Sequence, residues 1–195
     1  KTLKIFLWSA AFVCALMEPA SGQTDEPFVV AKGLAVQPFA TQGQLFNPSS
    51  IDVDDRGRVW VAEALNYRKK ARKEGDRILI LEDTDGDGRF DKRKVFIENI
   101  FFPTGLQVGF GGVWIGAAPH LLFIPDRDGD DVPDGDPQVH LEGFGMEDSH
   151  SITNSLRWGP DGWIYCTQGY SGGASRDIKS GEEGSFGHIP NGLAR

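Results

Sequence analysis

An aspartate-rich loop occurs twice in this chain, each time directly after an apolar run of strand-like residues. The first copy is residues 83–91 (DTDGDGRFD), and the second, 43 positions later, is residues 126–134 (DRDGDDVPD). A glycine turn between two alternating stretches of apolar and polar residues also recurs, at 51–61, 106–115 and 156–165. Such alternation around a turn is typical of a β-hairpin. A repeat of this length restricts the fold strongly, because each unit must bury apolar faces against its neighbours.

The rest of the repeated unit also consists of strand-like segments. Residues 77–82 (RILILE) correspond to 120–125 (HLLFIP), and a further strand follows each Asp loop, at 93–97 and 138–141. We therefore predict an all-β fold built from four-stranded units, which is the organisation of a β-propeller. The hairpins are spaced more widely than the Asp loops. The first unit therefore carries an insertion, which we place at residues 66–76 (NYRKKARKEGD).

The sequence predicts three regions: a signal segment, a lead-in and a partial propeller. Residues 1–22 are typical of a secretion signal, with a basic start, an apolar stretch and small residues at the end. An uncleaved membrane anchor is the alternative, and we expect an exported protein, periplasmic or membrane-associated. Residues 23–46 form a lead-in, and residues 47–195 supply about three blades of the four to eight in a closed propeller. We expect the N-terminal part of a longer propeller, with apolar faces exposed if it is made alone.

The composition argues against nucleic-acid binding and against a cysteine nucleophile. The chain has 28 acidic and 20 basic residues, a formal net charge of −8 and no basic face, so we expect no nucleic-acid binding. Of its two cysteines, Cys14 lies in the signal segment. Cys166 is then alone in a strand pattern, which is more typical of a small buried hydrophobe than of a nucleophile.

The Asp loops are candidate Ca²⁺ sites. Carboxylates at positions 1, 3, 5 and 9 of a loop need a cation to offset their repulsion, and hard oxygen ligands suit Ca²⁺. The alternative is a metal-free polar turn. Neither loop is an EF-hand, because Lys94 and Pro137 stand where the bidentate Glu would be, and Asp131 replaces a glycine that would ease the second turn. The predicted side-chain ligands are Asp83, Asp85, Asp87 and Asp91, and Asp126, Asp128, Asp130 and Asp134, with the carbonyls of Arg89 and Val132.

Strand order predicts which loops share a face. In an antiparallel unit the Asp loops lie at the same end as the tight glycine turns. The insertion and the connector at residues 142–151 lie at the opposite end, where propellers usually bind their ligand. We therefore expect the Asp loops to be structural clamps rather than the reactive centre.

The connector contains the most suggestive cluster for chemistry. Glu147 and Asp148 precede His150, and a histidine beside carboxylates can act as a general base; the alternative is a polar loop histidine with no task. Small polar residues at the starts of the inner strands suit a hydroxyl-rich ligand or cofactor, although they also form turns. These predicted binding residues are Asn47, Thr104 and Asn154, and Glu63, Asn66, Tyr67 and Arg68 could join them. We expect structural roles for His120, His140 and His188.

Four segments together resemble a known family. They are NPSSIDVDDRGRVWVAEALNYR, GDRILILEDTDGDGRFDK, FPTGLQVGFGGVWIG and NSLRWGPDGWIY, within about residues 45–195. As an ordered set they resemble the N-terminal propeller of the membrane-bound dehydrogenase family of planctomycete-type bacteria, which is related to quinoprotein glucose and sorbosone dehydrogenases. The resemblance implies a six-bladed propeller, export and oxidation of a sugar-like small molecule with pyrroloquinoline quinone (PQQ). It also implies a c-type cytochrome or a downstream haem domain as electron acceptor.

The resemblance bears on one catalytic residue. In glucose dehydrogenases of this type a histidine just before a strand ending in Gly-Pro-Asp is the base. The matching strand here is residues 154–161, and His150 is the nearest histidine, although an ungapped alignment places Ser151 at that position. The leading hypothesis is thus a PQQ-dependent sugar or sorbosone dehydrogenase. The alternatives are a non-enzymatic propeller that binds glycans or proteins, and a lactonase with an acidic metal cage at the channel mouth.

Overall fold

The computed structural model describes residues 29–67, 70–146, 148–169, 176–177 and 193–194. The chain divides into two compact units, Lys1–Gln37 and Pro38–Arg195, and every strand belongs to the second. The described residues form no helix, so none of them makes a helix that could cross a bilayer. The predicted signal segment, together with Glu147 and His188, lies outside the described residues.

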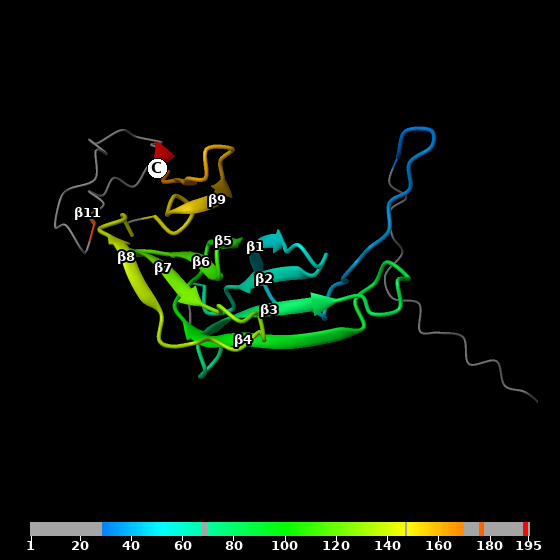
Figure 1. Ribbon diagram of the computed structural model, residues 1–195, viewed down its shortest axis with the longest axis horizontal. Coiled ribbons are helices and arrows are strands. Elements are labelled where there is room, and N and C mark those ends of the chain that lie inside the picture. Colours follow the sequence, from blue (N-terminus) through cyan, green and yellow to red (C-terminus); the bar gives the residue numbers. More distant parts are fainter. Residues whose placement is uncertain (1–28, 68–69, 147, 170–175, 178–192, 195) are drawn as a thin grey trace, which may run out of the picture. The chain divides into compact units, whose positions relative to one another are not determined.

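The described strands form three antiparallel sheets (Figure 1). The first has the order β1-β2-β3-β4, with strands β1 (Pro48–Val53), β2 (Val59–Glu63), β3 (Asp76–Glu82) and β4 (Lys92–Ile100). The second has the order β11-β8-β7-β6-β5, with β5 (Gly105–Val108), β6 (Gly112–Ala117), β7 (His120–Pro125), β8 (Gln138–Glu142) and β11 (Arg176–Asp177). The third has the order β12-β10-β9, with β9 (Asn154–Trp158), β10 (Ile164–Thr167) and β12 (Leu193–Ala194).

The all-β class and the strand pattern agree with expectation, and the insertion does lie between β2 and β3. One difference is that the second sheet has a fifth strand, because β11 pairs with the outer strand β8. An unpaired outer strand presents open backbone groups, which β11 partly satisfies. The number of blades in the whole protein stays a prediction.

The core forms because the middle strands are apolar on both faces. In β2, Trp60 and Ala62 point into a cluster shared by the first two sheets, whereas Val61 points the other way. The shared cluster contains Trp60, Ala62, Ile78, Ile80, Phe96, Ile100, Leu106, Val113, Ile115, Ala117 and Ile124. On the opposite face of the first sheet, Phe39 and Leu45 cover Val61 and its neighbours. Stacking of sheets is thus required by the alternation in each strand.

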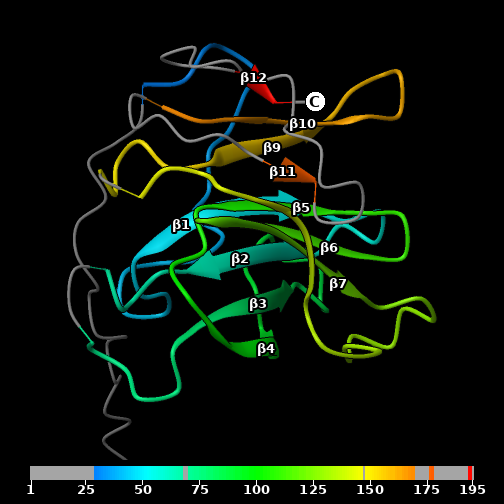
Figure 2. The ribbon, with the colours of Figure 1, turned by 90° about the vertical axis from the view of Figure 1, so that its left-hand side faces the viewer.

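The first strands of the three sheets lie side by side, with β5 between β1 and β9 (Figures 1 and 2). Asp52 of β1 accepts hydrogen bonds from Gln107 Nε2 at 2.6 Å and from the Val108 amide at 2.7 Å. The indole of Trp158 in β9 donates to the Val108 carbonyl at 3.0 Å. These bonds fix the neighbouring inner strands and bring their starting residues to one end of the fold.

A substitution at Gly112 can test the close contact between β6 and β7. A Cβ atom there would meet the Ile124 carbonyl oxygen at 2.3 Å and the ring of Phe123 at 2.6 Å. We expect Gly112→Ala to lower the free energy of unfolding by about 1–3 kcal/mol, the usual cost of overpacking. Gly135→Ala is the control, because a Cβ at Gly135 meets nothing within 4 Å. Equal denaturation midpoints for the two variants would contradict this account of the contact.

Candidate functional site

A cavity of about 460 Å³ lies where the inner strands begin. Its walls come from the starts of β1 and β9, the residue before β5, and the connector that follows β8. The polar lining residues are Ser49, Ser50, Thr104, Ser149, His150, Asn154, Ser155 and Arg157. Hydroxyl, amide and guanidinium groups around a shallow cavity suit a ligand that carries several hydroxyl groups.

His150 has partners on both ring nitrogens. Its Nε2 atom lies 2.6 Å from the hydroxyl of Tyr67, and its Nδ1 atom lies 3.2 Å from Oδ1 of Asp148. Ser149 donates to the Tyr67 hydroxyl at 3.2 Å. Two segments that are 83 residues apart in sequence therefore meet at one imidazole, which confirms that the insertion and the connector share an end of the fold.

Asp148 determines the tautomer that this arrangement favours. The amide of His150 holds the pKa of Asp148 below its usual range, helped by the Ser151 hydroxyl and the His150 ring. Asp148 is therefore a carboxylate at neutral pH and can only accept. The proton of neutral His150 then belongs on Nδ1, which leaves the Nε2 lone pair for the hydroxyl of Tyr67.

Tyr67 stacks on a neighbouring ring, and a buried carboxylate holds the backbone beside both rings. Its ring stacks on Phe102 at a centroid distance of 5.2 Å and an interplanar angle of 15°. Asp76, 1% exposed, accepts the amide of Asn66 at 2.8 Å and the amide of Phe102 at 3.0 Å. One carboxylate thus fixes the backbone on both sides of the stacked pair.

The predicted binding residues are only partly brought together. Thr104 and Asn154 line the cavity beside His150, but Asn47 lines a separate cavity of about 590 Å³. Asn47 has a positive φ of 48°, and its amide donates to the Ala64 carbonyl at 2.6 Å. Thr104 donates to the Thr153 carbonyl at 2.6 Å, so its hydroxyl also joins neighbouring inner strands.

Several other polar candidates have structural partners. Glu63 is buried, accepts the Phe46 amide and pairs with Arg77 at 2.5 Å, so it does not join the ring around the cavity. His140 packs against the rings of Trp114 and Phe123. Cys166 is buried, and burial raises the pKa of its thiol, as expected for a small hydrophobe.

The first Asp loop satisfies its leading carboxylate with backbone amides. Asp83 accepts the amides of Gly86, Asp87 and Gly88, and these bonds, that of Gly88 foremost, lower the pKa of Asp83. Asp83, Asp85 and Asp91 each place an oxygen within 4.8 Å of the others, and the predicted ligand Asp87 is not in this group.

The second Asp loop differs at its leading position. Burial raises the pKa of Asp126, and repulsion from Asp131, Asp130 and Asp128 adds to the effect, whereas the Gly129 amide acts against it and lowers the pKa. Asp126, Asp128 and Asp130 each place an oxygen within 4.8 Å of the others. The predicted ligand Asp134 is outside this group and accepts the Arg127 amide instead. This loop thus combines close carboxylates with incomplete compensation of their charge.

Two residues that position the site, and the role of Ser149 in the connector cluster, were not predicted from the sequence. Asp76 and Phe102 position Tyr67, and Ser149 connects the cavity to its hydroxyl. The available signals were a carboxylate that opens the most apolar strand and a serine next to the predicted base. Neither signal shows which partner lies opposite in the fold.

Comparison with known proteins gives one family match. A family model described as a domain of unknown function, DUF7133, matches residues 22–190. No curated protein matches the chain. A crystal structure of a protein proposed to be a gluconolactonase is similar at 17% identity with a TM-score of 0.45, over 74% of this chain and 49% of that protein. The chain thus spans about half the length of that structure, and a similarity of this size carries no functional argument.

The hydrogen bonds to Asp148 predict its titration. Because the pKa of Asp148 is lowered, their stabilising effect is present above the unfolded-state pKa and is lost as the pH falls through the folded-state pKa. We expect the Asp148 carboxyl carbon to titrate below the ordinary pKa of aspartate in an NMR pH series. Ser151→Ala should move the midpoint upward, since it removes a 2.9 Å hydrogen bond. A wild-type midpoint at or above the ordinary value would contradict the geometry.

Proposed function

The chain belongs to the DUF7133 family of domains of unknown function, and we propose that the His150 cavity binds a sugar-like molecule and oxidises one of its alcohol or aldehyde groups. The proposal includes a six-bladed propeller of the glucose and sorbosone dehydrogenase type, as the sequence resemblance implies. Because the family carries no assigned activity, support has to come from the residues of the cavity.

One observation carries the proposal: a hydrogen-bonded chain leads from the cavity to a carboxylate. The Ser149 hydroxyl lines the cavity and donates to Tyr67, whose hydroxyl lies 2.6 Å from His150 Nε2. His150 in turn faces Asp148. A base oriented by an acid is the arrangement that proton abstraction from a substrate hydroxyl requires.

The position of Ser149 indicates where a substrate hydroxyl would bind. A ligand hydroxyl that replaces Ser149 at the Tyr67 oxygen would pass its proton to Tyr67, which passes its own to His150 Nε2. Asp148 then stabilises the resulting imidazolium, because its charge lies beside Nδ1. In this mechanism Tyr67 and His150 move the proton, and Asp148 orients the ring.

Removing the hydrogen on the reacting carbon needs an acceptor. A bound PQQ would supply that acceptor, because its quinone can accept a hydride, which carries two electrons. PQQ carries several carboxylates, and among the described residues that line the cavity Arg157 offers the guanidinium to bind one. The cavity residues therefore support the sugar-like ligand more directly than the quinone, which rests on the resemblance.

Export and electron transfer belong to the same proposal. An exported protein, periplasmic or membrane-associated, would pass the electrons to a c-type cytochrome or to a haem domain elsewhere in its own chain. The signal-like residues 1–22 support export, and the resemblance supports the haem partner.

The lining of the cavity bears on the two alternatives. None of the described lining residues is acidic, which disfavours a lactonase that holds its metal in this cavity. A non-enzymatic propeller that binds glycans would use the same hydroxyl and amide groups. Reconstitution with PQQ and Ca²⁺ separates the cases, because a binder takes up sugars without sugar-dependent dye reduction.

The proton relay predicts the effect of two substitutions. His150→Ala should lower turnover by about 10²- to 10⁴-fold, the usual contribution of general acid–base catalysis. Tyr67→Phe should lower turnover in the same direction while it keeps the stacking on Phe102. The measurement is sugar-dependent dye reduction by the protein with the rest of its natural chain.

Ser151→Ala is the matched control for this experiment. It removes one donor to Asp148 but leaves His150 in place, so we expect a loss of less than about tenfold. If the histidine variant keeps near-normal turnover, or if both variants behave alike, the base lies elsewhere and the proposal fails.

A further inference from the structure

One carboxylate of the second Asp loop is buried with an oxygen that has no partner. Asp126 is 9% exposed, and its Oδ1 atom accepts no hydrogen bond from the described residues. An oxygen of Asp126 also lies within 4.8 Å of oxygens of Asp128 and Asp130. A buried charge without compensation is costly, so this position calls for a positive group.

The two arginines that line the same pocket as Asp126 pair with other carboxylates. Arg58 pairs with Asp54 at 2.8 Å and with Asp131 at 2.7 Å, and Arg56 pairs with Asp131 at 3.1 Å. Both arginines come from the β1–β2 turn, whereas Asp131 belongs to the β7–β8 loop. Asp131 thus connects the first sheet to the second.

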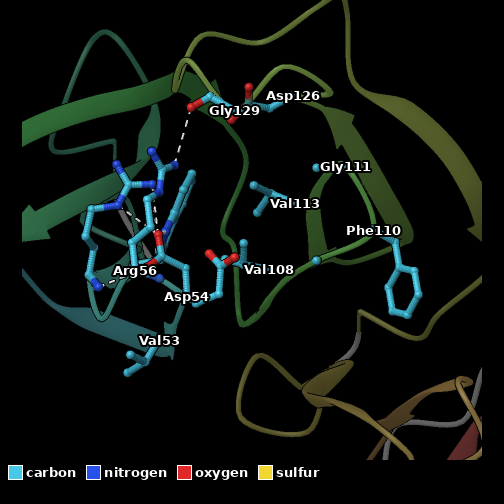
Figure 3. A pocket seen from close by; sticks show the side chains of 14 residues that line it. Val53, Asp54, Arg56, Val108, Phe110, Gly111, Val113, Asp126 and Gly129 are labelled. Carbon is cyan, nitrogen blue, oxygen red and sulfur yellow. Dashed lines mark hydrogen bonds and ion pairs between the residues drawn. The ribbon is translucent and has the colours of Figure 1, made fainter.

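Backbone contacts extend this connection. Arg56 donates to the Gly129 carbonyl at 3.4 Å, and Lys94 of β4 donates to the Asp130 carbonyl at 2.9 Å. Figure 3 shows Asp126 and Gly129 on one side of the pocket and Asp54 and Arg56 on the other. The cations from the first sheet therefore bind the later part of the loop and leave the buried Asp126 oxygen unpaired.

We propose that the β7–β8 loop binds Ca²⁺ through Asp126, Asp128 and Asp130, and that the ion fixes Asp131 as a latch on the β1–β2 turn. A hard cation among three carboxylates compensates the buried oxygen, and carbonyls or water complete its shell. Ca²⁺ suits this loop better than Mg²⁺ because it accepts irregular oxygen geometry.

The conformation of Asp131 supports the latch. Its φ is 66°, a left-handed conformation that is uncommon for residues other than glycine. Glycine would relieve the strain but would leave Arg56 and Arg58 without this carboxylate. An ion bound by residues 126–130 would fix the backbone just before Asp131. The Asp131 carboxylate would then stay in position to pair with Arg58.

The test is a calcium titration of the full-length protein. All variants carry Asp85→Asn, so that the first Asp loop does not contribute. Calorimetry should give a Kd of about 10⁻⁴ to 10⁻³ M, as in extracellular sites that lack a full ligand set. About 10 mM Ca²⁺ should raise Tm by about 5 °C, and Mg²⁺ should raise it less.

Four substitutions separate Ca²⁺ binding from the latch. Asp126→Asn keeps the side-chain shape and should abolish the calcium response, and Asp128→Asn, at an exposed position, serves if that variant does not fold. Asp136→Asn changes the charge equally outside the cluster and should keep the response. Asp131→Asn should still bind Ca²⁺ but should lose at least about half of the gain in Tm.

Each outcome decides a part of the proposal. Absence of calcium binding in the Asp85→Asn background, or a full response in Asp126→Asn and Asp128→Asn, overturns the metal site. An unchanged gain in Tm for Asp131→Asn overturns the latch while the metal site stands. Equal losses in Asp126→Asn and Asp136→Asn would show a general charge effect and would overturn both.

Discussion

Burial of both faces of the middle strands is the constraint on which the rest of the structure depends. In β2 and β3, successive side chains enter different clusters, so the first sheet is stable only when each face is covered. The second sheet covers one face, and the segment around Phe39 covers the other. Once sheets stack in this way, the loops have only two ends of the fold at which to gather.

The two ends have different chemistry for a physical reason. At the turn end, Asp54 of the β1–β2 turn and Asp131 of the second Asp loop both pair with Arg58, so charge compensation dominates. At the connector end, hydroxyl and amide groups surround a cavity whose described lining has no carboxylate. In this chain of net charge −8, the Asp148 carboxylate lies behind the His150 ring and not in the described lining itself.

The sequence predicts the features that depend on neighbouring residues. Period-two alternation and glycine turns predict the hairpins, and the insertion follows from a difference in spacing. Contacts between distant residues are not readable in this way. Tyr67 and His150 are in contact although they are 83 residues apart in sequence, and Arg58 and Asp131 although they are 73 apart. The stacking of whole sheets determines which distant residues come into contact. Asn47 was predicted to lie with Thr104 and Asn154, but it has a positive φ and lines a different cavity.

The insertion between β2 and β3 leaves the strand ladder unchanged. Pairing runs without a break from Val59 opposite Leu81 to Glu63 opposite Arg77, and the extra residues begin only beyond it. Tyr67 is carried on this extra segment. The segment that places Tyr67 against His150 and Ser149 can therefore change in length and composition over evolution without altering the core. Relatives with different β2–β3 segments could diverge in ligand preference while they share one scaffold.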